Sequence, residues 1–156
     1  ERKEKHTSKS LKGHFSKANT TPKQISMEFT RFEEGSRKQF GETLDVTVFT
    51  EGEFIDVAGT TKGHGFQGVV GRHGFGGVGQ TTHGQHNRLR APGSVGASSY
   101  PSRLFKGLRM AGQTGNVRRK SINLEIVKIV PEKNLILVKG SVPGAKGSFL
   151  KLERWS

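Results

Sequence analysis

The sequence contains no cysteine among its 156 residues, and this absence excludes two classes of site. Without thiols the chain forms no disulfide and offers no thiolate ligand to a metal. Long apolar runs are also missing: no stretch approaches eighteen residues, so we expect no membrane span and no membrane partner. Hydrophobic residues make up only 31% of the chain, which is low for a compact domain of this length. We therefore expect one domain with a long appendage.

Acidic residues are absent from the middle of the chain, between Asp56 and Glu125. These 68 residues, 57–124, hold ten Lys or Arg, four His and fifteen Gly, and they carry +10 of the formal net charge of +13. Lys and Arg displace condensed counterions from phosphates, and glycine lets the backbone approach a phosphate closely. The pattern predicts binding to nucleic acid. We expect RNA rather than DNA, because folded RNA rewards stacking and shape contacts.

The candidate RNA-binding residues are spread through this segment rather than bunched. Arg forms paired hydrogen bonds with phosphate and stacks on bases, whereas His and Phe stack on bases without needing a fixed spacing. The candidates are Lys62, His64, Arg72, His73, Phe75, His83, His86, Arg88, Arg90, Arg103, Lys106, Arg109, Arg118, Arg119 and Lys120.

Three enzymatic or cofactor interpretations of the same segment are weaker. The pattern G-x-G-x-x-G occurs at 63–68 and 74–79, but a nucleotide site needs a following helix, and we predict none because 69–74 is too rich in glycine. The four His have no nearby acid or Cys to complete a zinc site. Serines at 94–102 lack a nearby acid to orient a catalytic His. We expect no cofactor, no metal, no catalytic residue and no small-molecule substrate.

Apolar and polar residues alternate in several short stretches outside the glycine-rich segment. They predict strands at 25–32, 44–48, 54–58, from Ile122 to a turn at 131–134, at 135–138 and at 149–152, with a bulge near Val127. The spacing of Leu11 and Phe15 predicts a short helix over 10–18. Five or six short strands indicate an all-β barrel or sandwich, and a small closed barrel fits because closure removes exposed edges. We expect residues 1–58 and 116–156 to form this body, with 1–24 partly irregular, and 59–115 to form an extended loop.

One stretch resembles the signature of the ribosomal protein L-three family, the universal large-subunit proteins. The matching positions are Phe49, Asp56, Gly59, Thr61, 63–65, Gly68 and Arg72. Further family-like strings fall at 82–84, 92–94, 105–107, 110–113, 137–140 and 142–144, and together they resemble a bacterial form lacking roughly the first quarter. The chain departs from many bacterial members at 72–75, where they carry Trp, and at 97–99, where they carry a methylated Gln.

The resemblance implies a barrel of the type found in translation factors, with the 59–115 loop reaching into large-subunit ribosomal RNA toward the peptidyl transferase centre. It implies a cytoplasmic structural protein of the ribosome that binds ribosomal RNA early in subunit assembly. It also implies contacts with neighbouring large-subunit proteins, those numbered fourteen and nineteen in the family scheme. An RNA-binding or chaperone module outside the ribosome is the alternative that the charge pattern leaves open.

Overall fold

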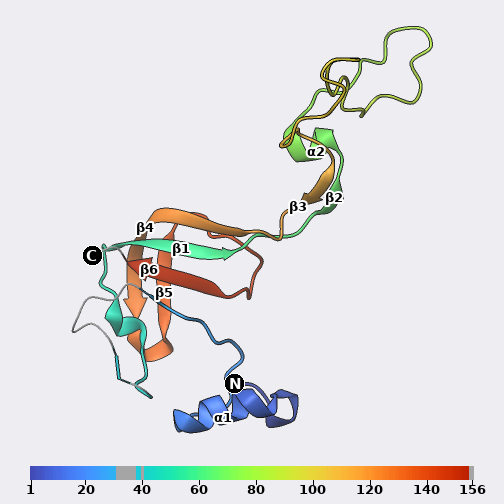
Figure 1. The fold of residues 1–156 in the computed structure, drawn as a ribbon. Helices are drawn as coiled ribbons and strands as arrows, with labels where there is room; N and C mark the ends of the chain where they lie inside the picture. Colours follow the sequence, from blue (N-terminus) through green and yellow to red (C-terminus); the bar gives the residue numbers. More distant parts are fainter. Residues whose placement is uncertain (31–37, 40, 155–156) are drawn as a thin grey trace. The chain divides into compact units, whose positions relative to one another are not determined.

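The computed structural model describes residues 1–30, 38–39 and 41–154. The chain divides into two compact units, one formed by 1–49 with 130–135 and the other by 50–129 with 136–156. Figure 1 shows the course of the chain and the labels of its elements.

The first unit contains the predicted helix, α1 (Lys9–Lys17), which follows a single 3-10 turn, η1 (Glu4–His6). One glycine inside a helix costs only about 1 kcal/mol, so Gly13 does not prevent it. Phe15 is its one buried residue. The chain then turns at Asn19, whose φ of 50° is left-handed, and folds back so that the Thr20 N–H donates to the Phe15 carbonyl at 3.1 Å. Burial of Phe15 under this returning segment fixes the helix.

Two predicted strands of the first unit are wrong. Residues 25–30 form no strand, and 31–32 lie outside the described residues. In place of the strand at 44–48 the structure has a 3-10 turn, η2 (Val46–Val48). Alternation supplies an apolar face but does not by itself produce a ladder, and Met27 and Phe29 remain 47% exposed. Among the described residues, no strand of either sheet includes this segment.

The second unit is built on an antiparallel sheet whose strand order is β5-β4-β1-β6. Its strands are β1 (Phe54–Thr60), β4 (Arg118–Val130), β5 (Leu135–Lys139) and β6 (Leu150–Arg154), and a 3-10 turn, η3 (Pro131–Lys133), joins β4 to β5. These elements confirm the strands expected at 54–58, after Ile122, at 135–138 and near 149–152. Strand β1 pairs with both β4 and β6, so it lies in the middle of the sheet.

The core of this sheet is small, and a bulge lies within it. Ile55, Val57 and Ile126 are fully buried. The register between β1 and β4 shifts at Asp56, where two residues of β4 face one residue of β1. Asn123 on the bulged strand has a φ of 55°. The bulge therefore lies a few residues earlier than the position near Val127 that the sequence predicted.

The prediction of an all-β closed barrel is wrong. Within the described residues the sheet is open, with β5 and β6 at its edges, and two α-helices accompany it. The barrel required the two N-terminal strands that do not form, because four strands are too few to close around a core. Neither α-helix of the described chain is long or apolar enough to cross a bilayer.

Residues 61–117, here called the excursion, connect β1 to β4. Its two ends continue the β1–β4 ladder: the Thr61 N–H donates to the Val117 carbonyl at 3.0 Å, and the His64 N–H to the Thr114 carbonyl at 2.9 Å. Next come the paired strands β2 (Gly65–Gln67) and β3 (Gly112–Thr114). Figure 1 shows this narrow ribbon running on from β1 and β4.

A short helix, α2 (Val69–His73), follows β2, so the prediction that no helix could follow the first glycine pattern is wrong. The helix needs only one turn of hydrogen bonds, such as the Arg72 N–H to the Gly68 carbonyl at 2.9 Å. Gly74 ends it with a φ of 72°, a conformation that glycine adopts without strain. Of the two glycines that argued against a helix, Gly71 lies inside it and Gly74 terminates it.

Candidate nucleic-acid interface

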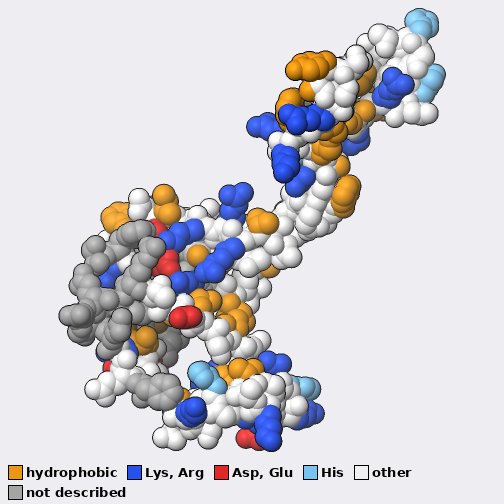
Figure 2. All heavy atoms as spheres, in the orientation of Figure 1, with side chains coloured by type: hydrophobic (Ala, Val, Ile, Leu, Met, Phe, Trp, Pro, Cys, Tyr) orange, Lys and Arg blue, Asp and Glu red, His pale blue; other side chains and the backbone are white. Residues whose placement is uncertain are grey.

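The cations of the excursion lie open to solvent. Of the fifteen predicted RNA-binding residues, thirteen are exposed, and only His73 and Phe75 are partly buried. Figure 2 shows blue Lys and Arg side chains along the excursion, interleaved with orange hydrophobic ones. Within the described part of the chain, eleven of the fourteen Lys, Arg and His candidates make no side-chain hydrogen bond or ion pair: Lys62, His64, His83, His86, Arg88, Arg90, Arg103, Lys106, Arg109, Arg118 and Arg119. Their charges are available to an external polyanion.

Arg103 is held by an aromatic ring rather than by an acid. Its guanidinium carbon lies 5.3 Å from the centroid of the Phe105 ring. Such a contact orients the planar guanidinium without neutralising it. Phe105 is itself 63% exposed, so part of the ring remains open for stacking. The pair offers both a charge and a flat surface, which suits a nucleotide.

The side chains of Arg72 and His73 both contact the Met110 carbonyl and so join the two sides of the excursion just beyond β2 and β3. The Arg72 Nη1 donates to the Met110 carbonyl at 2.7 Å, and His73 Nε2 lies 3.0 Å from the same oxygen. A methyl group on Gly112 would come within 2.7 Å of Arg72 Nη1, so a side chain there would displace the guanidinium from this position. The sequence could not reveal this contact, because its acceptor is a backbone carbonyl 37 residues away.

Lys120 is the one predicted RNA contact that forms ion pairs within the described chain. Its ammonium lies 3.0 Å from Asp56 and 2.8 Å from Glu153, and so links β4 across β1 to β6. Hydrogen bonds to Glu153 and Asp56 raise the pKa of Lys120 above its ordinary value. Hydrogen bonds from Lys120 and Lys151 lower the pKa of Glu153. Lys120 and Glu153 therefore stay charged at neutral pH.

Asp56 is a site residue that the sequence reasoning did not single out as a contact. It is 2% exposed, and its Oδ1 accepts the Asn123 N–H of the bulge at 3.0 Å. Its Oδ2 pairs with Lys120. One carboxylate thus holds both the bulge and the cation at the root of the excursion. The available signal was its place as the last acid before the acid-free segment.

The model of the family described as ribosomal protein L3 matches residues 27–134 of this chain. The chain belongs to the ribosomal protein L3 family. The Large ribosomal subunit protein uL3 of Chlorobaculum parvum is 56% identical to it over 152 residues, which is 97% of this chain and 72% of that relative. The resemblance in the signature is thereby confirmed. As a member of this structural family, the chain is a cytoplasmic ribosomal protein and not an enzyme.

The structure gives physical reasons for two L3-family signature positions. A methyl group at Gly59 would lie 2.6 Å from Leu150 Cδ2 and 3.1 Å from the Pro143 carbonyl oxygen, so a side chain there would force Leu150 to move and press on the Pro143 backbone. Thr61 exchanges hydrogen bonds with the backbone of Val117: its hydroxyl donates to the carbonyl at 3.2 Å and accepts the N–H at 3.3 Å. Both positions fix the start of the excursion.

The far part of the excursion, residues 74–111, encloses a hollow of about 250 Å³. Phe75, Pro92, Val95 and Leu108 line it, and Arg109 also contributes. These residues come from three separate stretches of the chain, so they form a small apolar cluster within a segment that has few apolar residues. The sequence analysis predicted that Phe75 contacts RNA, and the structure places it beside protein side chains in this hollow.

The other chemical interpretations find no support in the geometry. The first glycine pattern leads into a helix of five residues, and the strand beside it pairs in antiparallel fashion, unlike the parallel unit of dinucleotide-binding folds. Among the described residues no three His, Asp or Glu side chains are grouped to hold a metal ion. The Ser94 hydroxyl donates to the Gly96 carbonyl at 3.2 Å rather than to a histidine.

Proposed function

We propose that this chain is a structural constituent of the large ribosomal subunit that binds large-subunit ribosomal RNA through residues 59–115 and the adjoining cations. The observation that carries the proposal is the exposed, unpaired set of cations on an excursion that contains no acidic residue. Counterion release from RNA phosphates supplies the affinity, and the ladder at the root supplies the geometry. Membership of the L3 family supports the ribosomal RNA as the ligand.

We further propose that the protein takes part early in subunit assembly and that its excursion reaches toward the peptidyl transferase centre. The excursion supports this role because it is two strands wide at its root and lacks a large core. Such a segment fits between RNA helices, where a compact domain does not. Its glycines and arginines allow close backbone approach and paired phosphate contacts.

Neighbouring large-subunit proteins, those numbered fourteen and nineteen, are the proposed protein partners. The sheet of the second unit supports protein contacts, because several large apolar residues on it remain exposed. These include Phe54 at 60%, Ile122 at 64% and Val127 at 55%. Apolar residues at such exposure are stabilised when a partner covers them.

A salt titration tests the RNA proposal. The full chain is bound to a large-subunit ribosomal RNA fragment, and its affinity is measured between 50 and 200 mM salt. If six to ten cations engage phosphate, the affinity falls by roughly 10³ to 10⁵ over this range. The triple variant Arg88→Gln, Arg103→Gln, Arg109→Gln should reduce the slope of log affinity against log salt by about 2 to 3.

The matched control is the triple variant Lys128→Gln, Lys133→Gln, Lys146→Gln, which removes the same charge from exposed positions outside the excursion. We expect the control to change the slope much less. A flat titration of the native chain, or equal slopes for the two triple variants, contradicts the proposal. The alternative of a chaperone outside the ribosome predicts that the chain dissociates from large subunits during sedimentation at high salt, whereas a constituent stays bound.

A further inference from the structure

Positive charge gathers in a second segment besides the excursion. Residues 1–24 contain seven Lys or Arg and two acids, and residues 57–124 contain ten Lys or Arg and no acid. All remaining residues together contain nine Lys or Arg and eleven acids. The net charge therefore resides in two separate stretches, and the first of them includes α1.

The lysines of α1 form one exposed surface. Lys9, Lys12 and Lys17 are exposed, and within the described residues none of them forms an ion pair or a side-chain hydrogen bond. At 3.6 residues per turn Lys9 and Lys17 lie on the side of the helix away from Leu11 and Phe15, and Lys12 lies between that side and Phe15. Figure 2 shows blue basic side chains on this helix. The helix contains no acidic residue to balance them.

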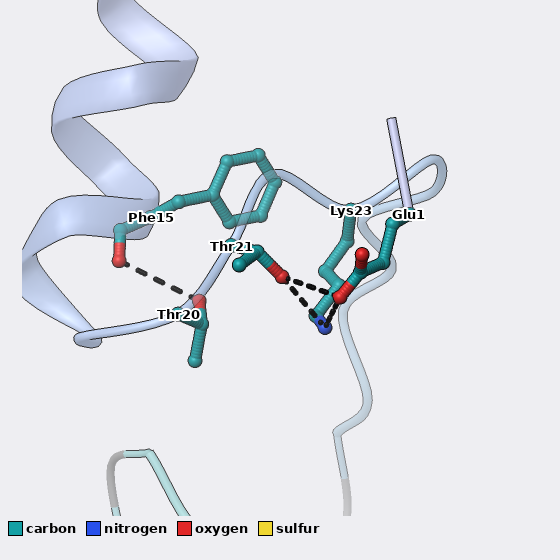
Figure 3. A network of polar contacts seen from close by, with 5 residues as sticks. All are labelled: Glu1, Phe15, Thr20, Thr21 and Lys23. Atoms are coloured by element: carbon teal, nitrogen blue, oxygen red, sulfur yellow. Dashed lines mark hydrogen bonds and ion pairs between the residues drawn. The ribbon is translucent and has the colours of Figure 1, made fainter. Parts of the chain in front are cut away.

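The nearby carboxylate of Glu1 is engaged elsewhere. The Thr21 hydroxyl donates to Glu1 Oε1 at 2.9 Å, and the Lys23 ammonium lies 3.8 Å from the same oxygen. Figure 3 shows these residues together beside the segment that covers Phe15. Glu1 thus balances Lys23 and leaves the three lysines of α1 uncompensated. The second acid of the segment, Glu4, lies on η1 rather than on α1.

Of the three lysines, only Lys17, in the last turn, suits the helix dipole. The first turn of α1 carries Lys9 and no acid, although the helix dipole favours negative charge there. Ser8 at the N-cap forms no capping hydrogen bond through its side chain. A helix shaped only for stability would place Asp or Glu in this turn. The charge is therefore better explained by an external ligand.

We propose that α1 is a second phosphate-binding surface, which contacts the RNA backbone through Lys9, Lys12 and Lys17. The inference rests on the proposed function, since it takes the same RNA as the ligand. The helix carries Lys and no Arg. An ammonium acts as a point charge, whereas a guanidinium makes planar paired contacts and stacks. The lysines of α1 therefore attract phosphates without recognising bases.

A membrane is a less suitable ligand for α1. The one buried apolar residue of the helix, Phe15, already packs within the protein, so the helix has little apolar surface for a membrane.

The test compares three charge-matched triple variants of the full chain in the salt titration. They are Lys9→Gln, Lys12→Gln, Lys17→Gln; the excursion triple Arg88→Gln, Arg103→Gln, Arg109→Gln; and the control triple at 128, 133 and 146. Gln has a helix propensity close to that of Lys, so α1 should persist, and far-ultraviolet circular dichroism checks this. A Lys→Arg triple at 9, 12 and 17 keeps the charge and should bind like the native chain.

We expect the α1 triple to lower the slope of log affinity against log salt by about 2 to 3, with the control unchanged. If the excursion triple weakens binding and the α1 triple matches the control, the inference is overturned while the proposed function stands. If neither triple differs from the control, both are overturned. If the α1 triple loses binding to vesicles of anionic lipid while its RNA affinity stays intact, the ligand of α1 is a membrane, and the inference is also overturned.

Discussion

Asp56 shows how a single buried carboxylate organises the root of the excursion. It satisfies the free N–H of the bulge at Asn123 and compensates the charge of Lys120. A buried carboxylate without such partners would cost several kcal/mol, so its contacts must form together. An Asn at this position could also accept the Asn123 N–H through its amide oxygen, but only Asp balances the charge of Lys120.

Replacement of Asp56 should therefore separate these two contributions. We expect Asp56→Ala to lower the free energy of unfolding by about 2 to 3 kcal/mol, because it leaves the Asn123 N–H without its acceptor and leaves the Lys120 ammonium with Glu153 as its remaining carboxylate partner. Asp56→Asn should cost only about 1 kcal/mol. Urea denaturation measures both. Asp45→Ala, at an exposed position, is the matched control and should change stability by less than about 0.5 kcal/mol. Equal losses for Ala and Asn would show that the hydrogen bond to Asn123 contributes little.

Among the elements, the paired strands at the base of the excursion depend on one glycine. Gly115 has a φ of 73°, and a methyl group there would lie 2.0 Å from the Lys62 carbonyl oxygen. Beside it the Asn116 N–H donates to that same carbonyl at 3.3 Å. A residue with a side chain would therefore strain the backbone and push the two strands apart at the same point.

Gly115→Ala should open the ladder at this point at a cost of about 2 kcal/mol. Hydrogen exchange of the His64 and Asn116 amides measures the opening directly, and RNA affinity should fall because the excursion loses its fixed root. The control is Gly76→Ala, where a methyl group meets no atom within 4 Å. Protection of the two amides unchanged by Gly115→Ala would contradict this view of the root.

The elements also show which features of the chain could be read from its sequence. The strands around Ile55 and Ile126 were predictable, because their apolar residues are buried by neighbouring strands. The strand predicted around Met27 does not form, although its residues alternate in the same way, and this outcome could not be read from the pattern. Helix α2 was missed because the glycines of its sequence were taken as breakers, whereas the Arg72 contact with Met110 helps to hold it. Exposure of the cations followed from composition, but the internal pairing of Lys120 required knowledge of the register.

At the scale of the whole molecule, the excess of positive charge makes stability depend on pH. The pKa of Glu153 is below its ordinary value of 4.5, so its contribution is present above that pH and is lost as the pH falls through the lower folded-state value. The pKa of Lys120 is raised above 10.5, so its contribution is lost only as the pH rises beyond that value. Protonation of carboxylates also adds repulsion to a chain that already carries +13.

We therefore expect the free energy of unfolding to decrease as the pH is lowered past about 4.5. Glu153→Gln should make this decrease smaller. The variant should cost about 0.5 to 1 kcal/mol at pH 7, since Glu153 is partly exposed, and less at pH 3. Urea unfolding between pH 3 and 7 gives the comparison. Glu132→Gln removes an exposed carboxylate from the turn after β4 and serves as the control. An acid dependence identical to that of the native chain would exclude Glu153 as a contributor.

The excursion enters and leaves through neighbouring antiparallel strands, β1 and β4, and this connectivity makes it a cassette. A few residues suffice to join two such strands, so the intervening stretch can be shortened, lengthened or exchanged between relatives without a change in the connectivity of the sheet. Any change must keep the two sides balanced, because an unmatched residue on one side would shift the pairing and reverse the faces of that strand. Near Thr61 and Val117, L3 proteins should therefore differ by insertions or deletions that occur on both strands together. Beyond the contact between Arg72 and Met110, insertions and deletions should occur without this constraint.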